Sequence, residues 1–150
     1  MIDNVCNSVV ESELIKHGCY ASTTRGVSMK PLFRTGRDVV ILKVPEGELS
    51  RFDVALYKNN AGIYTLHRVI GVKENEYLIR GDNTFAIEHI KKDKILAVLA
   101  EFNRKGKKYS VDHKGYRIYV RIWCFIYPLR YVLHLPLALA RKIYHKFIKK

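Results

Sequence analysis

Residues 62–82, GIYTLHRVIGVKENEYLIRGD, contain two runs of apolar and β-branched residues separated by the polar tetrapeptide KENE. Such runs on either side of a short polar turn are typical of a β-hairpin. Three further segments have strand character, namely residues 38–45 (DVVILKVP), 53–59 (DVALYKN) and 95–102 (ILAVLAEF), and residues 102–111 suggest a second hairpin around Gly106. About six short strands imply a compact, largely antiparallel β-domain.

The chain begins with a predicted helix. Asp3 can act as an N-cap for a helix over about residues 4–17, and Gly18 is placed to end it. Apolar residues recur within it near helical spacing, at Val5, Val9, Leu14 and Ile15. The predicted fold class is therefore mainly β (α+β), with an N-terminal helix.

Positive charge is concentrated at the C-terminal end. The chain has a formal net charge of +13, and residues 104–150 hold 13 Lys and Arg against the single acid Asp112. Residues 1–103 are nearly neutral, with 14 basic and 13 acidic residues. We therefore expect two parts, a domain over residues 1–112 and a basic tail over residues 113–150.

The tail has the pattern of two or three amphipathic helices. Lys114, Arg117 and Arg121 recur at helical spacing within a segment that is otherwise apolar. After Pro128 and Pro136, a second apolar face is formed by Leu137, Ala140, Tyr144 and Phe147. The nearly continuous apolar surface favours burial or lipid over nucleic acid.

Residues 122–140 are long enough to approach a bilayer span, but they contain Arg130, His134 and two prolines. We therefore expect helices that lie on an anionic membrane surface. The open alternative is that they pack on the β-domain or pair between subunits, and the oligomeric state is not determined by the sequence.

Several classes of protein are disfavoured. Cys6, Cys19 and Cys124 form no C-x-x-C pair and leave an odd thiol, which fits a reducing compartment. Acidic residues interrupt the first twenty positions, so no secretory signal is expected, and we predict a membrane-associated, otherwise cytoplasmic protein that is not secreted. The histidines lack metal-binding spacing and no phosphate-binding glycine loop is present, so no metal or other cofactor is expected.

One serine has a context that suits nucleophilic chemistry. Ser28 lies in residues 25–33, RGVSMKPLF, after a polar run and shortly before Pro31, which favours the first turn of a helix. A serine there can present its hydroxyl outside the strand ladder while its own N–H faces an incoming carbonyl. Most Ser-x-x-Pro sequences are only helix entrances, so this motif alone decides nothing.

Five segments taken together are more specific. SMKPLF, GRDVVIL, FDVALY, LHRVIGV and LIRGDN occur in that order and resemble the catalytic boxes of the signal peptidase I family and of the related self-cleaving SOS-type repressors. The resemblance covers roughly residues 22–100. It implies a compact antiparallel β catalytic domain and a serine endopeptidase that cleaves a peptide or protein precursor.

The resemblance also points to one branch of the family. The box His67-Arg68-Val69 is similar to the histidine branch, the archaeal and endoplasmic-reticulum type, in which histidine takes the place of a catalytic lysine. In that branch a G-D-N turn and a second acid supply the carboxylates, which implies Asp82 and Glu88 here. Asp82 either orients the imidazole or braces its own turn, and Glu88 is the second candidate.

Three departures from the family pattern are visible. Arg37 interrupts the usual G-D-x-V box. Gly26 stands where many members have a second serine that assists the oxyanion, so the oxyanion hole would rest on the Ser28 N–H and a neighbouring amide or water. No N-terminal membrane span is expected.

The resulting hypothesis assigns Ser28 as nucleophile and His67 as general base, since histidine is mostly unprotonated at neutral pH. The apolar residues next to the serine are candidates for substrate binding or for the core, namely Val27, Met29, Leu32 and Phe33. The competing hypothesis is a non-catalytic basic module that binds a membrane or nucleic acid.

Overall fold

The computed structural model describes the backbone of residues 2–133 and the side chains of residues 9–133. A helix, α1 (Ile2–His17), precedes a series of strands, and a second helix, α2 (Lys114–Phe125), follows them. The strands are β1 (Cys19–Thr23), β2 (Val39–Lys43), β3 (Val54–Lys58), β4 (Tyr64–Val72), β5 (Glu76–Arg80), β6 (Glu88–Lys91), β7 (Ile95–Arg104) and β8 (Lys107–Ser110). A short 3-10 helix, η1 (Lys92–Lys94), leads into β7, and residues 127–133 are again helical.

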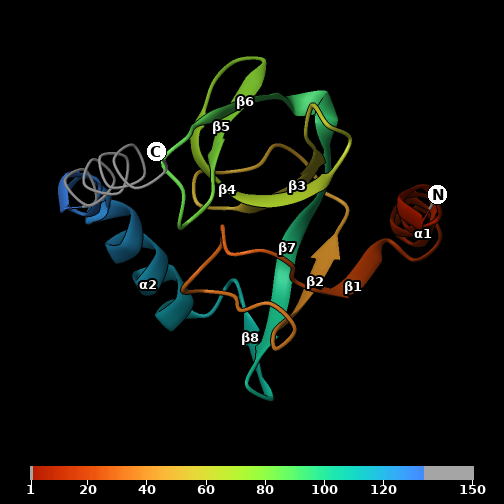
Figure 1. Cartoon of the computed structure of the whole chain (residues 1–150), viewed down its shortest axis with the longest axis horizontal. Helices are drawn as coiled ribbons and strands as arrows, with labels where there is room; N and C mark the ends of the chain where they lie inside the picture. Colours follow the sequence, from red (N-terminus) through yellow and green to blue (C-terminus); the bar gives the residue numbers. More distant parts are fainter. Residues whose placement is uncertain (1, 134–150) are drawn as a thin grey trace, which may run out of the picture.

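The strands form one antiparallel sheet that curves into a half-barrel (Figure 1). Their order is β1-β2-β7-β3-β4-β5-β6, and β8 pairs with the end of β7. The long strand β7 contacts β2 along its second half and β3 along its first half, so it joins the two sides of the sheet. This confirms the predicted mainly antiparallel β fold with a leading helix and a helical C-terminal region.

Two strands were not predicted, and both lie at the edges of the sheet. β1 has the sequence CYAST and β6 the sequence EHIK, with side chains that alternate between exposed and partly buried. An edge strand needs few apolar residues because one side of its backbone and much of its surface face solvent. Neither segment therefore carries the apolar alternation by which the other strands were recognised.

The prediction for α1 is correct in extent but wrong in detail. The helix begins at Ile2, so Asp3 lies inside it rather than at its N-cap, while Gly18 ends it with a φ of 68° and an amide that donates to Leu14. Over residues 9–17, whose side chains are described, Val10 and Leu14 are buried, whereas Ile15 is 84% exposed. This part of the helix therefore packs on the core through an i, i+4 pair, and Val9 and Ile15 lie outside it.

Helix α2 packs against the β-domain, as expected if the tail folds back onto the domain. Val120 is buried, and Tyr116 and Tyr119 pack against the main hydrophobic core. The predicted helical face at residues 137–147 lies outside the described residues. Within the described part of the chain, no helix is long and apolar enough to cross a bilayer.

Candidate active site

Ser28 lies in a tight turn between β1 and β2. The Lys30 amide donates to the Val27 carbonyl at 3.1 Å, and the Phe33 amide donates to the Met29 carbonyl at 3.0 Å. These are turn hydrogen bonds, so the predicted helix entrance at Pro31 is wrong; the Lys30–Pro31 peptide bond is cis. Apolar side chains on both sides of Pro31 anchor the turn in the core, which fixes the position of the partly exposed serine.

The loop that follows β5 holds this turn in place. The Asn83 amide donates to the Ser28 carbonyl at 2.7 Å, and the Asn83 side-chain amide donates to the Val27 carbonyl at 3.3 Å. Gly81 is the point of closest approach: a Cβ there would lie 2.8 Å from the Ser28 carbonyl oxygen and 3.1 Å from His67 Nε2. Only glycine therefore allows the serine turn and the histidine to approach this loop together.

His67 comes from β4, and Glu88, its partner, from β6. The imidazole is buried, and its Nδ1 lies 2.9 Å from Glu88 Oε1. An ionised carboxylate can only accept, so Nδ1 carries the proton and donates. Nε2, the atom beside Gly81 and the serine turn, is then left with a free lone pair. The tautomer fixed by Glu88 is the one that a general base acting on Ser28 requires.

Tyr57 on β3 completes this cluster. Its hydroxyl lies 3.2 Å from His67 Nδ1 and hydrogen-bonds with Glu88, and the residue has no exposed surface. Burial, followed by the hydrogen bond with Glu88 and the charge of that carboxylate, holds the pKa of Tyr57 well above its usual range. Tyr57 therefore stays protonated, and its hydroxyl can donate to the Glu88 carboxylate.

Asp82 has a different partner. Both of its carboxylate oxygens accept from Arg68, at 2.7 Å from Nε and 2.7 Å from Nη2, and the two side chains are only 1% and 2% exposed. Burial alone would lower the pKa of Arg68, but the charge and hydrogen bonds of Asp82 raise it above its usual value. Of the two alternatives for Asp82, the geometry corresponds to bracing the loop, and it is Glu88 that contacts the imidazole.

The backbone of this loop is also held from α2 and the helical residues after it. The Asp82 carbonyl accepts from Trp123 Nε1 at 3.2 Å and from Arg130 Nη2 at 2.9 Å. Arg130 lies over the Trp123 ring, and Arg80 lies over the Tyr127 ring. The C-terminal helical region is thus attached directly to the loop that positions Ser28 and His67.

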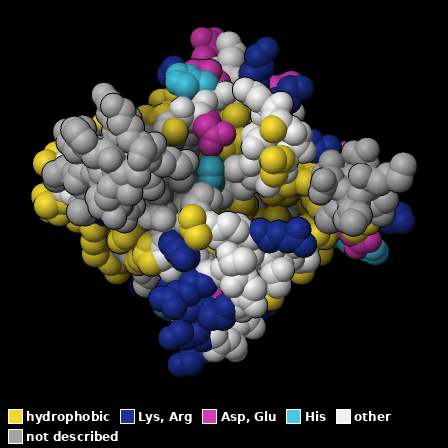
Figure 2. Space-filling view, viewed as in Figure 1, with side chains coloured by type: hydrophobic (Ala, Val, Ile, Leu, Met, Phe, Trp, Pro, Cys, Tyr) yellow, Lys and Arg dark blue, Asp and Glu magenta, His cyan; other side chains and the backbone are white. Residues whose placement is uncertain are grey.

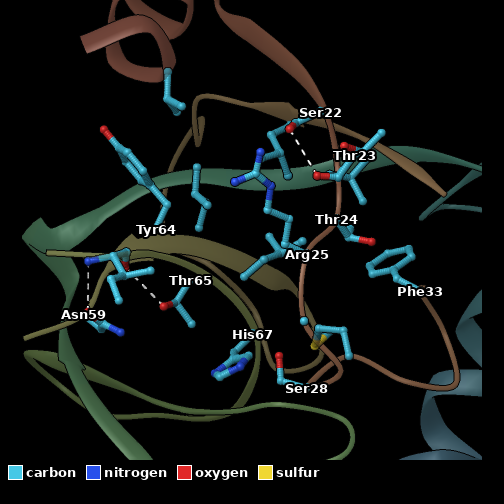
Figure 3. A pocket seen from close by; sticks show the side chains of 18 of the residues that line it. Ser22, Thr23, Thr24, Arg25, Ser28, Phe33, Asn59, Tyr64, Thr65 and His67 are labelled. Carbon is cyan, nitrogen blue, oxygen red and sulfur yellow. Dashed lines mark hydrogen bonds between the residues drawn. The ribbon is translucent and has the colours of Figure 1, made fainter. Parts of the chain in front are cut away.

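A cavity of about 950 Å³ opens beside these residues. Figure 3 shows the side chains of Ser28 and His67 next to each other at one end of it, with Tyr64 and Asn59 towards the other. Its lining includes residues 22–26, at the end of β1 and in the turn after it, and residues 61–67, which lead into the first half of β4. Apolar core residues complete it. Its volume is near the upper end of the range of about 300–1,000 Å³ that is typical of ligand pockets.

Two of the four predicted substrate-binding residues line this cavity. Met29 and Phe33 do so while also belonging to the hydrophobic core. Leu32 is turned into the core and is 2% exposed, and Val27 stands at the outer side of the turn with 55% exposure. Neither Leu32 nor Val27 lines the cavity, because residues along a tight turn point in different directions.

Arg37, which interrupts the expected G-D-x-V box, lies in a turn over residues 34–38. Its guanidinium donates to both oxygens of Asp38 at 2.6 Å, and the Arg34 amide donates to the same carboxylate at 2.8 Å. Gly36, with a φ of 71°, donates to the Thr24 carbonyl. This turn therefore contacts the backbone just after β1, in the segment that leads to Ser28.

Sequence reasoning missed Tyr57 and Gly81. The signal for Tyr57 was the alternation of β3, because Ala55 pairs with His67 and Tyr57 lies on the same face. The signal for Gly81 was its place before Asp82 in a turn, although the need for its missing side chain follows only from the packing.

No group of His, Cys, Asp and Glu among residues 9–133 is arranged to hold a metal ion. Comparison with protein-family models and with curated proteins finds no match for this sequence. The chemistry of the site must therefore be argued from its own geometry.

Proposed function

We propose that this protein is a serine endopeptidase of the signal-peptidase-like type, histidine branch, that cleaves a peptide or protein precursor. The observation that carries the proposal is the position of His67, whose Nδ1 donates to Glu88 at 2.9 Å while its Nε2 faces Gly81 and the Ser28 turn. A serine, a histidine and a carboxylate in this order are the parts of a proton-transfer unit for acyl transfer.

In the proposed mechanism, Ser28 Oγ attacks the carbonyl carbon of the scissile peptide bond while His67 Nε2 takes its proton. The tetrahedral intermediate collapses, the C–N bond breaks, and the imidazolium returns the proton to the leaving amine. Water then attacks the acyl-enzyme with His67 again as base, which releases the new carboxyl end and restores Ser28. Glu88 stabilises the imidazolium in both halves.

The oxyanion is proposed to accept a hydrogen bond from the Ser28 N–H. Gly26 offers no hydroxyl for a second one, so a neighbouring amide or a water must supply it. Gly26 adopts a φ of 80°, which favours glycine, and its carbonyl accepts from Thr35 Oγ1 at 2.5 Å. The conformation before the serine is thus held by the glycine dihedral angle and by the Thr35 hydroxyl.

Substrate binding as an added strand is supported by the sheet edges around the cavity. β4 pairs with β3 from Tyr64 onwards, but its pairing with β5 begins only at Arg68. The Val69 amide and carbonyl bond towards the β3 side, so those of Leu66 point to the other side, because strand groups alternate. β1, on the opposite wall, is itself an edge strand. An extended peptide in the cavity can therefore form main-chain hydrogen bonds beside Ser28.

The test is hydrolysis of a synthetic peptide library, with products identified by mass spectrometry. Wild type should cleave, and Ser28→Ala should lower the activity at least about a thousandfold. His67→Ala should lower it by a similar factor. The double variant should be at most slightly less active than either single variant, because the two residues act as one unit. Ser22→Ala is the matched control, since Ser22 lines the same cavity and its hydroxyl donates to the neighbouring Thr23 carbonyl. Absence of cleavage by wild type, or full activity in Ser28→Ala, contradicts the proposal.

A further inference from the structure

Helix α2 has two apolar faces, and only one of them is used by the domain. The inner face carries Tyr116, Val120 and Trp123, which pack against the core or bond to the loop after β5. The amides of Ile126 and Arg130 donate to the carbonyls of Ile122 and Ile126, both at 3.0 Å, so the helical path continues past the irregular residue 126. Residues 114–133 thus form one helical path attached to the domain along one side.

The outer face of this path carries a row of large apolar side chains. They follow the i, i+4, i+7 spacing of one helical stripe and are exposed as follows: Ile118 57%, Ile122 56%, Phe125 85%, Leu129 62% and Leu133 61%. Figure 2 shows hydrophobic side chains gathered on the side of the molecule where Figure 1 places α2. We call these five residues the outer row. A continuous row of this kind is more apolar surface than scattered exposed residues provide.

Cations flank the outer row along one side. Lys114, Arg117 and Arg121 are exposed and recur at i, i+3, i+7, which places them on one stripe next to the row. Residues 113–150 contain no aspartate or glutamate. The surface therefore combines apolar side chains with unopposed positive charge, which is the composition of helices that lie in the headgroup region of anionic bilayers.

The charges also argue against a second copy of this chain as the occupant. If two copies met through the outer row, the cations of both copies would come together, namely Lys114, Arg117 and Arg121. The helical path contains no acidic residue that could pair with them, so these charges would repel each other. Nucleic acid fits poorly, since the outer row offers mostly aliphatic side chains and not a stacking platform beside the cations.

We infer that the outer row, with its flanking cations, lies in the interface of an anionic lipid bilayer and holds the domain there. Tyr116 and Val120, together with the contacts of Trp123 and Arg130 with the Asp82 carbonyl, attach the helical path to the domain along its inner face. The helix then lies flat on the membrane, and the loop that positions Ser28 is attached to its inner face. The inference does not depend on the peptidase activity.

The test is flotation of the full chain with vesicles of phosphatidylcholine alone or mixed with phosphatidylglycerol. We expect binding to the anionic vesicles, little binding to the neutral ones, and weakening at high salt. The outer-row variant Ile122→Ser with Phe125→Ser should lower partitioning at least tenfold, and Arg117→Gln with Arg121→Gln should do so as well, at roughly fivefold for each cation.

Matched controls change the same properties elsewhere. Ile15→Ser with Val72→Ser removes exposed apolar side chains away from α2, and Lys105→Gln with Lys107→Gln removes two exposed cations at the turn between β7 and β8. Both should float like wild type, and thermal melts of all variants show that each is folded.

Three results overturn the inference. They are failure of the wild-type chain to float at low salt, equal flotation with neutral and anionic vesicles, and full flotation of the outer-row variant. Light scattering on the same samples tests the other occupant: a wild-type dimer that Phe125→Ser converts to a monomer would assign the row to a contact between copies instead.

Discussion

The two carboxylates near the candidate active site, Asp82 and Glu88, should respond in opposite ways to neutralisation. Arg68 is buried, and it donates to both Asp82 oxygens, to the Phe52 carbonyl at 2.8 Å and to the Tyr116 hydroxyl at 3.2 Å. Asp82→Asn removes the only carboxylate among these partners, so a guanidinium that is 1% exposed loses its counter-charge.

Breaking a buried ion pair in this way costs about 3–5 kcal/mol of the free energy of unfolding. For a chain of this size that corresponds to a fall of roughly 10 °C in Tm. The variant should still fold at room temperature, since single domains have about 5–15 kcal/mol of stability. Its kcat should fall only modestly, because neither the His67–Glu88 contact nor the approach of Gly81 to the Ser28 turn and His67 involves the Asp82 carboxylate.

Glu88→Gln should show the reverse pattern. Its carboxylate is partly exposed and accepts from His67 Nδ1, so an amide there keeps the shape but no longer selects the tautomer that leaves Nε2 free. Loss of an orienting acid lowers kcat by up to about 10⁴-fold in serine hydrolases, and we expect at least about a hundredfold here with Tm nearly unchanged.

Thermal melting by circular dichroism and peptide hydrolysis at 20 °C, the latter well below either melting point, measure the two quantities separately. Arg68→Met combined with Asp82→Asn should recover part of the lost stability, because no uncompensated charge then remains buried. If Asp82→Asn abolishes turnover at unchanged Tm while Glu88→Gln stays active, the two carboxylates have exchanged roles and the assignment is refuted.

Three further predictions follow from single contacts. Gly81→Ala places a Cβ 2.8 Å from the Ser28 carbonyl and 3.1 Å from His67 Nε2, so we expect both Tm and kcat to fall, and unchanged kcat would show that this approach is not needed. Tyr57→Phe removes a buried donor to Glu88 and should lower the free energy of unfolding by about 1–3 kcal/mol, as measured by denaturant titration. In the hydrolysis assay it should lower kcat less than Glu88→Gln does. Burial would raise the pKa of Asp38, but Arg37 and the Arg34 amide outweigh burial and lower it. The contribution of this carboxylate to the free energy of unfolding is therefore complete at neutral pH and is lost as pH falls below about 4. Denaturation curves of wild type and Asp38→Asn should converge at that pH.

The strands that alternate or carry β-branched runs could be predicted because their apolar residues must face a core. The segments DVVILKVP and GIYTLHRVIGV each became a strand close to the predicted bounds. The edge strand β6, EHIK, has no such constraint, and it is the strand that carries Glu88. Burial requires apolar residues at regular positions, so it produces a recognisable sequence pattern. Backbone pairing at the edge of a sheet imposes almost no such requirement.

Because β6 was not predicted, the sequence alone did not show whether Asp82 or Glu88 contacts the imidazole of His67. In the register of the sheet, Val69 pairs with Ile79 and Ile79 pairs with Glu88, so Glu88 lies on the same face as Val69 and His67. Arg68 has the opposite orientation, and it is the residue that Asp82 meets. The choice depends on pairing register, which sequence spacing alone does not determine.

The same holds for the turn that carries Ser28. Its residues could be recognised as a candidate nucleophile with an apolar neighbourhood, but Met29 and Phe33 reach the cavity while Leu32 does not. The direction of each side chain in a tight turn depends on the backbone dihedral angles. The sequence pattern does not reveal these angles.

The central claim is that Ser28 is an activated nucleophile, and the most direct measurement is the site at which a fluorophosphonate modifies the full chain. Trypsin leaves the Lys30–Pro31 bond intact, so Ser28 falls in peptide 26–34 and Ser22, in the same cavity, falls in peptide 17–25. We predict one adduct per chain, on peptide 26–34, absent in Ser28→Ala and strongly slowed in His67→Ala. No adduct on the wild-type chain, or an adduct on peptide 17–25, would contradict the claim.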